Sequence, residues 1–235
     1  MPCVNCNIEF DGQFCPNCGE KKNIDKITFH SIITSLFSGL LDMDRGILFN
    51  LKNLTLHPKR TIINYINGKR RYILNPVSYA IITISIYLFL DSVLPRSERT
   101  KLPKVDIFEA QNMGRKLGYF IRDKMKFLWL TYAIYAAFLT KLFFRKYNYF
   151  EHLAINLFIL GHVTVVAILT RLVYHKELII FNFLVYIYFS ILLYKVFRNP
   201  KDKFGTSILA ILVVFVSFLF FLGVPFIFVN YLDNT

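Results

Sequence analysis

Five long apolar stretches constrain this chain most strongly, because each is about as long as a helix that crosses a bilayer. They cover residues 77–94, 127–144, 153–173, 178–197 and 206–229. The chain is 55% hydrophobic, whereas a soluble globular domain has roughly 45–50% apolar residues. The sequence therefore predicts an all-α integral membrane protein with about five transmembrane helices in a membrane domain at residues 77–235.

All four cysteines lie in the first 18 residues, as Cys3-x2-Cys6 and Cys15-x2-Cys18. Two such knuckles supply the four thiolates of a closed tetrahedral zinc site. A closed site has no open position for a substrate, so we expect a structural zinc. A redox pair and another metal are the alternatives. Residues 1–22 are too few to bury a core, so the metal must stabilise this predicted zinc-ribbon head.

A basic linker at residues 23–76 joins the head to the first apolar stretch. Apolar residues recur at helical spacing over residues 28–41, 47–56 and 60–66. Pro58 and Asn67-Gly68 are expected to separate and end the last two segments. Two arrangements remain open. We favour amphipathic helices lying in the membrane interface over a small soluble bundle packed against the membrane domain.

The chain has 28 Lys and Arg against 15 Asp and Glu, a formal charge of +13. In a soluble protein this excess would suggest nucleic acid. Beside membrane helices, this excess of basic residues is explained more simply by the orientation of the chain in the membrane. We therefore expect no nucleic-acid partner. The basic residues before the first stretch, and after the second and fourth, place the N-terminus in the cytoplasm and the C-terminus outside. Residues 95–126 disagree with this orientation, because they carry nine basic residues on the predicted outside. Either this segment forms an external amphipathic helix or one of the spans is wrongly assigned.

Lys69, Arg70 and Arg71 form a basic cluster just before the first apolar stretch. Such a cluster is a candidate contact for a phosphate-bearing lipid head group or a partner. The alternative, which we favour, is a positively charged anchor on the cytoplasmic side.

The third apolar stretch carries the candidate intramembrane polar site, with Glu151 and His152 at its mouth and His162 near its middle. Glu151 and His162 share a helix face but lie about 16 Å apart along the axis. An ionisable group at this depth is a candidate for a proton or substrate path. We favour a neutral histidine bonded to a neighbouring helix. For Asp91 and Arg171, near the outer helix ends, we favour snorkelling to the head groups over an ion pair.

The chain resembles a family of bacterial multi-pass membrane proteins of unknown function with an N-terminal zinc-ribbon head. The resemblance lies in Cys3-x2-Cys6, Cys15-Pro16-Asn17-Cys18-Gly19, Leu41-Asp42-Met43-Asp44-Arg45-Gly46, Pro58, Tyr65-Ile66-Asn67-Gly68-Lys69-Arg70, Asn75-Pro76 and Tyr149-Phe150-Glu151-His152-Leu153. It is specific over residues 1–80 and loose beyond about residue 165. The resemblance implies a multi-pass inner-membrane protein and implies no activity.

These observations favour a non-enzymatic accessory or scaffold protein of the bacterial inner membrane, whose cytoplasmic head recruits a protein partner. The expected partners are membrane lipids and that protein, and a homo-oligomer is compatible with the sequence. The alternative is a small permease or proton-coupled carrier that uses Glu151 and His162. An intramembrane enzyme is the weakest hypothesis, because no second catalytic group accompanies His162 in the sequence. No phosphate loop, metalloprotease helix or nucleophile elbow is present, and we assign no catalytic residue.

Overall fold

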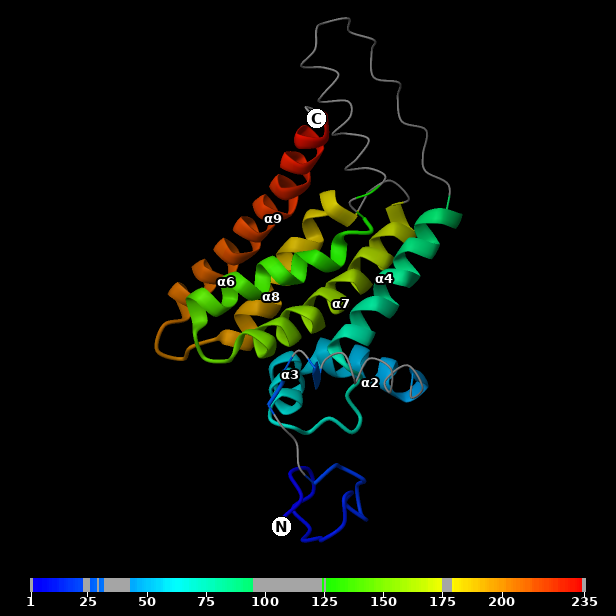
Figure 1. Cartoon of the computed structure of the whole chain (residues 1–235), viewed down its shortest axis with the longest axis vertical. Helices are drawn as coiled ribbons and strands as arrows, with labels where there is room; N and C mark the ends of the chain where they lie inside the picture. The colour runs from blue at the N-terminus through cyan, green and yellow to red at the C-terminus, as the bar shows by residue number, and fades with distance from the viewer. Residues whose placement is uncertain are drawn as a thin grey trace, which may run out of the picture.

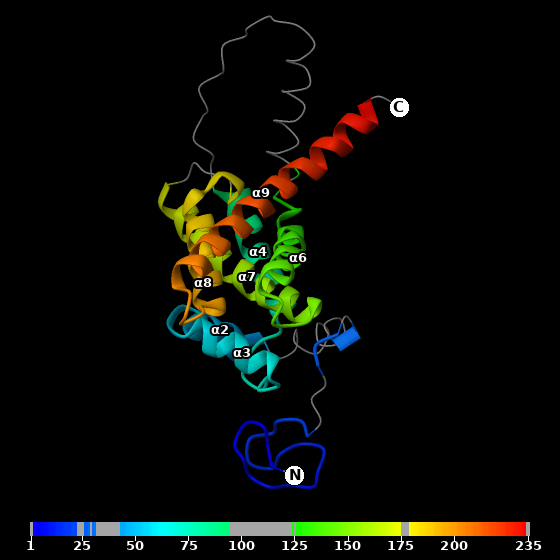
Figure 2. The ribbon, with the colours of Figure 1, turned by 90° about the vertical axis from the view of Figure 1, so that its left-hand side faces the viewer.

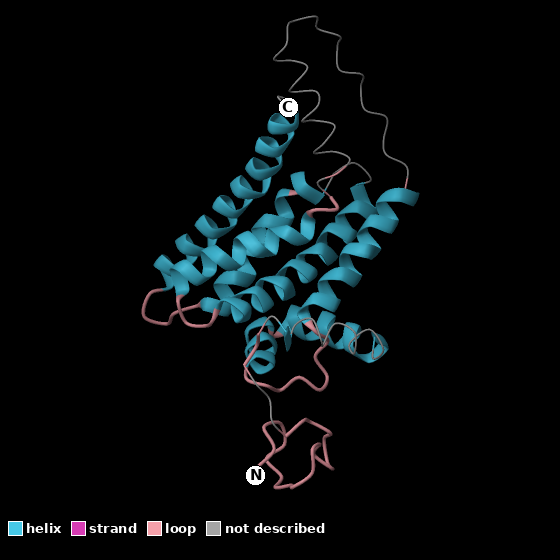
Figure 3. Ribbon diagram, viewed as in Figure 1, coloured by secondary structure: helices cyan, strands magenta, loops and turns pink. Residues whose placement is uncertain are grey.

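The computed structural model describes residues 2–22, 26–28, 30–31, 43–94, 124, 126–174 and 179–233. From residue 43 onward the described chain is mainly helical, as predicted, and the described residues contain no named strand (Figures 1 and 3). The α-helices are α2 Met43–Leu56, α3 Pro58–Ile66, α4 Pro76–Val93, α6 Tyr132–Phe144, α7 Tyr149–Tyr174, α8 Phe183–Phe197 and α9 Lys203–Asp233. Short 3-10 turns, Trp129–Thr131 and Ile179–Phe181, precede α6 and α8.

Three of the described helices are long and apolar enough to cross a membrane, which is consistent with a membrane protein. They are Pro76–Val93, Tyr149–Val173 and Lys203–Gly223. Two further apolar helices, Trp129–Phe144 and Phe183–Phe197, are shorter. At 1.5 Å per residue they extend about 24 and 22 Å, against a hydrocarbon core of about 30 Å. They coincide with two of the five predicted stretches, so spans at these two positions remain proposals.

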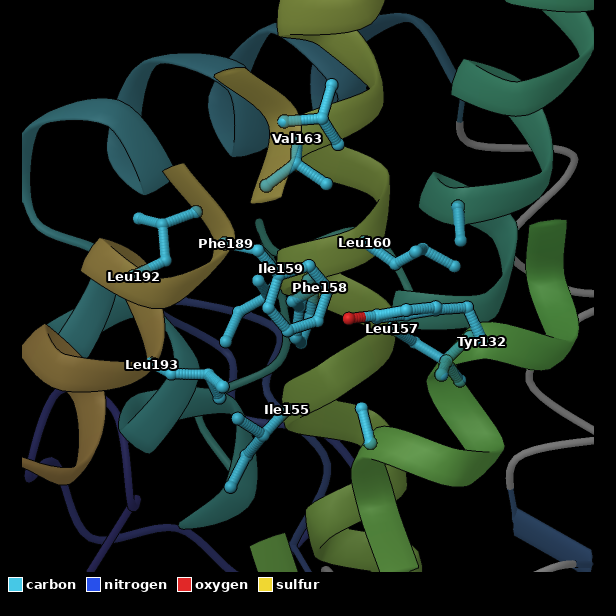
Figure 4. Close-up of a cluster of buried hydrophobic side chains, with 14 of the residues drawn as sticks. Tyr132, Ile155, Leu157, Phe158, Ile159, Leu160, Val163, Phe189, Leu192 and Leu193 are labelled. Carbon is cyan, nitrogen blue, oxygen red and sulfur yellow. The ribbon is translucent and has the colours of Figure 1, made fainter. Parts of the chain in front are cut away.

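Helix α7 is the centre of the bundle. It packs against α4, α6 and α8, while α9 lies over α6 and α8 (Figures 1 and 2). Figure 4 shows consecutive α7 side chains, among them Phe158 and Leu160, in the buried cluster that also contains Tyr132 and Phe189. Three alanines of α6 are fully buried, namely Ala133, Ala136 and Ala137. Such small residues let apolar helices pack closely.

Helices α4 and α7 approach closely at Gly161. A Cβ built there would lie 2.7 Å from Cδ1 of Tyr79 and 3.1 Å from Cα of Ala80. Any larger residue would therefore push the two helices apart. This crossing holds Tyr79 beside the following residue of α7, His162.

Helices α2 and α3 cross one end of the bundle, between it and the head (Figure 1). Pro58 stands in the first turn of α3, and the helix ends before Asn67, with Gly68 at φ +92°, so both predicted boundaries are confirmed. One face of α3 is buried, including Ile62 and Tyr65. Its contacts with α7 and α8 fit either predicted arrangement of the linker. Most of the predicted 28–41 helix and of the 95–126 loop lies outside the described residues.

Candidate metal centre and buried polar sites

The four cysteine sulfurs form one compact cluster. Their Sγ atoms all lie within 4.8 Å of one another, and all four thiols are free. Two of the Sγ–Sγ separations are 3.4 Å between Cys3 and Cys18 and 3.5 Å between Cys6 and Cys15. A tetrahedral zinc with Zn–S bonds of about 2.3 Å would place its sulfurs about 3.8 Å apart. The cluster therefore fits a four-thiolate metal site, as the spacing predicted.

The head is built from two copies of one knuckle, twelve residues apart. In each copy the first cysteine donates its N–H to a carbonyl five residues on: Cys3 to Ile8 at 3.0 Å and Cys15 to Glu20 at 2.9 Å. A residue in the left-handed region follows each second cysteine, Asn7 at φ +61° and Gly19 at φ +67°. Both copies read Cys-x-Asn-Cys, so the sequence contained a signal for this duplication. The described head has isolated bridges, Pro2–Glu9 and Phe14–Lys21, without the strands of a full ribbon.

The thiols do not ionise equally. The backbone N–H of Ile8 lowers the pKa of the Cys6 thiol to about 6. At Cys18 the backbone near Glu20 acts in the same direction, but desolvation and the thiols of Cys3 and Cys6 outweigh it and raise the pKa to about 11. Four neighbouring thiolates repel one another unless a cation lies between them. A bound divalent metal would supply that cation.

Glu20 fastens the head to the loop between α3 and α4. Its carboxylate is buried and Oε2 accepts the backbone N–H groups of Arg70 at 3.1 Å and Arg71 at 3.2 Å. Beside it, a Cβ on Gly19 would overlap the guanidinium of Arg71, the flexible end of an exposed side chain that can move away. The left-handed backbone at φ +67° is therefore what favours glycine here. The predicted Lys69-Arg70-Arg71 cluster thus lies against the head, a relation that the sequence did not reveal.

The cationic side chains of this cluster are partly engaged within the chain. Arg70 donates from Nε to the Tyr65 carbonyl at 3.2 Å, and its guanidinium stacks over the Tyr65 ring at 5.1 Å. Arg71 is exposed and lies 5.4 Å from the centre of the Tyr72 ring. Lys69 is half-buried. The lipid or partner contact predicted for these residues stays a prediction.

Glu151 has a local partner at the start of α7. Its carboxylate accepts the Asn148 backbone N–H at 2.7 Å, and the Asn148 side chain accepts the Glu151 N–H at 2.8 Å. This reciprocal pair is a capping box, which satisfies free N–H groups at a helix start. The neighbouring His152 is fully buried and stacks on Phe197 at 5.5 Å. Its ring nitrogens have no hydrogen-bond partner among the described residues.

His162 joins three helices. Its Nδ1 lies 3.0 Å from the Tyr79 hydroxyl on α4, and its Nε2 lies 3.2 Å from Thr55 Oγ1 on α2. Thr55 gives its hydroxyl proton to the Leu51 carbonyl at 2.7 Å, so it accepts from His162. The contacts therefore assign a neutral ring with Nε2 protonated and Nδ1 accepting from Tyr79. This is the geometry expected of a histidine that links neighbouring helices.

Asp91 holds a buried ion-pair cluster at the other end of the bundle. It accepts from Lys126 Nζ at 2.8 Å and pairs with Arg171 Nε at 3.4 Å. The side chains of Asp91 and Arg171 are each 2% exposed, so the favoured snorkelling interpretation is wrong and the ion pair is present. The physical reason is that α4 and α7 bring the two residues together, where an unpaired charge would be costly. Nothing in the sequence indicates Lys126 as a third member.

Comparisons with known proteins reach only part of the chain. No curated protein and no solved structure matches it. Residues 44–88, which cover most of α2, all of α3 and most of α4, match a family described as "Protein of unknown function (DUF3667)". This segment contains the Tyr65–Arg70 motif on which the resemblance rested in part. Over residues 44–88 the chain is therefore similar to a family whose function is unknown.

Proposed function

We propose that this chain is a non-enzymatic accessory protein of the bacterial inner membrane, with about five spans, a cytoplasmic N-terminus and an external C-terminus. Its head holds one structural zinc through Cys3, Cys6, Cys15 and Cys18. The head presents a surface to a protein partner, while the bundle fixes that surface at the membrane.

One observation carries this proposal. The head is hydrogen-bonded through Glu20 to the loop before α4, and it has exposed apolar side chains. Its own core consists of the cysteines and Phe10. Val4, Ile8 and Phe14 remain 41%, 45% and 60% exposed. Large apolar groups on a rigid support are typical of protein contacts, where a few such anchors carry most of the binding energy. Glu20 supplies the rigidity, because it bonds the head to the loop that enters α4.

The contacts of the candidate intramembrane residues favour this function over a carrier. Glu151 is engaged in the capping box of α7. His162 has hydroxyl partners at both ring nitrogens and is only 3% exposed. Two cavities in the described structure are lined by other residues, near α8 and α9. A proton path would need a group free to exchange its proton with water, which these contacts do not offer.

Photo-crosslinking in native membranes tests the proposal. A photoreactive residue at position 14 of the full chain should give one discrete protein adduct. Position 13 is the matched control, because Gln13 is an exposed polar neighbour on the same head. No adduct from position 14, or equal adducts from both positions, would contradict the docking role. An adduct that is twice the 27.6 kDa chain would identify the partner as a second copy.

A further inference from the structure

An apolar groove runs between α8 and α9. Its volume is about 660 Å³, within the range of roughly 300–1,000 Å³ that is usual for ligand sites. Ile187 and Ile191 of α8 and Ile211 and Phe215 of α9 line it, and each of these side chains is between 43% and 60% exposed. Polar groups are few along its length. In a membrane such a groove faces hydrocarbon, so an acyl chain fits it.

A basic cavity continues the groove at one end. It has a volume of about 540 Å³ and shares Ile191 and Tyr194 with the groove. Its walls include three cationic side chains, Lys59 of α3, Lys195 of α8 and Arg198 just after α8. The groove and this cavity are therefore one continuous surface with an apolar part and a cationic part.

The three cations are available to an anion. Lys59 donates from Nζ to the Arg198 carbonyl at 3.3 Å, which fixes α3 against the end of α8 and leaves two ammonium protons. Lys195 and Arg198 are exposed. Among the ion pairs of the described residues, none joins a carboxylate to any of the three. The acid nearest in sequence, Asp202, accepts the Gly205 N–H at 2.8 Å at the start of α9.

The position of the cationic part also suits a lipid head group. Lys195 and Arg198 lie where α8 and α9 meet, at the bundle end that also bears α3 (Figure 1). Tyr194 stands at the junction of the two cavities, and tyrosine is typical of the head-group level of a membrane. Clustered basic residues at that level attract anionic phospholipid.

We propose that this surface binds one anionic phospholipid, with an acyl chain along the α8–α9 groove and its phosphate at Lys59, Lys195 and Arg198. The site is separate from the Lys69-Arg70-Arg71 cluster, which lies against the head. It does not depend on the docking role proposed for the head.

Native mass spectrometry of the full chain in detergent tests this site, with phosphatidylglycerol and phosphatidylcholine as probes. The intact chain should retain one phosphatidylglycerol with at least about tenfold tighter binding than phosphatidylcholine, since each basic residue contributes about 1 kcal/mol. The triple variant Lys59→Gln, Lys195→Gln, Arg198→Gln should lose that preference. The matched control, Lys201→Gln with Lys203→Gln, removes exposed bases outside the cavity and should retain it.

A second variant tests the groove independently of charge. Ile211→Trp fills the apolar part and should weaken phosphatidylglycerol binding about tenfold while the bases remain. The proposal is wrong if both lipids bind equally, if the triple variant keeps the preference, or if Ile211→Trp has no effect. Displacement of the lipid by millimolar inorganic phosphate would also overturn it, because the site would then recognise phosphate alone. Thermal unfolding of each variant checks that it is folded.

Discussion

The Glu20 carboxylate accepts the backbone N–H of Arg70 at 3.1 Å, and this contact joins the cysteine head to the segment that leads into α4. The two groups are fifty residues apart in the sequence. Because Glu20 also provides the carbonyl that closes the second knuckle, metal binding and head position depend on the same residue. The head is therefore expected to keep one orientation on the membrane domain only when its knuckles are folded.

Glu20→Ala should release the head from this loop. Hydrogen bonds to a charged group contribute about 1.5–3 kcal/mol each, so the amides of Arg70 and Arg71 should exchange with deuterium at least about tenfold faster. Hydrogen exchange of the peptide that contains both residues measures this. Glu9→Ala is the control, since Glu9 is an exposed carboxylate on the same head. Unchanged exchange in Glu20→Ala would show that the contact does not hold the head.

The purified chain should contain one zinc, and Cys15→Ser should lose it. A three-thiolate site binds more weakly, and the fold of so small a head depends on the metal. Elemental analysis gives the zinc content per chain. Gln13→Ser, a neighbouring exposed position, should retain a full equivalent. An intact chain without zinc, or a Cys15→Ser variant with a full equivalent, would rule out this site.

The features that could be predicted from the sequence are those set by local pattern. Apolar runs predict the helices, and Pro58 and Asn67-Gly68 fix the ends of α3 because they act on the backbone directly. The cysteine spacing predicts the cluster because two Cys-x2-Cys knuckles supply the four thiolates of one tetrahedral site. The contacts of Glu20 and Lys126 could not be predicted, since they join segments distant in the sequence and depend on how the helices pack.

The candidate polar residues of α7 show how far the sequence reaches. The sequence places Glu151 and His162 on one face of a helix, and their separation argued against a shared site. The capping box of Asn148 and Glu151 could have been predicted from the Asn-x-x-Glu spacing, although our expectation for Glu151 did not include it. The Thr55 partner of His162 comes from α2 and has no signal in the sequence.

Gly161→Ala should destabilise the bundle. The added Cβ would meet Tyr79 and Ala80 at 2.7 and 3.1 Å, and overpacking of this kind costs about 1–3 kcal/mol. Thermal unfolding in detergent should show a lower midpoint. Gly223→Ala is the matched control, because a Cβ there meets nothing within 4 Å. Equal midpoints for the two variants would mean that α4 and α7 are not in close contact at this position.

Asp91→Asn should remove the carboxylate charge that Lys126 and Arg171 share in a buried site. Breaking a buried ion pair from one side costs about 3–5 kcal/mol, so the unfolding midpoint in detergent should fall clearly. The double variant Asp91→Asn, Arg171→Met also removes the buried guanidinium charge, leaves only the more exposed Lys126 ammonium, and should recover part of the loss. If the double variant is less stable than Asp91→Asn, the buried charge of Arg171 is not what destabilises the single variant.

If a metal-held head forms the docking surface, the crosslink from position 14 should depend on zinc. Membranes that carry the position-14 probe are stripped with a graded series of chelator concentrations, and both zinc content and adduct yield are measured. The adduct yield should fall in proportion to the zinc content and return when zinc is restored. An adduct yield that stays constant while zinc is removed would contradict it.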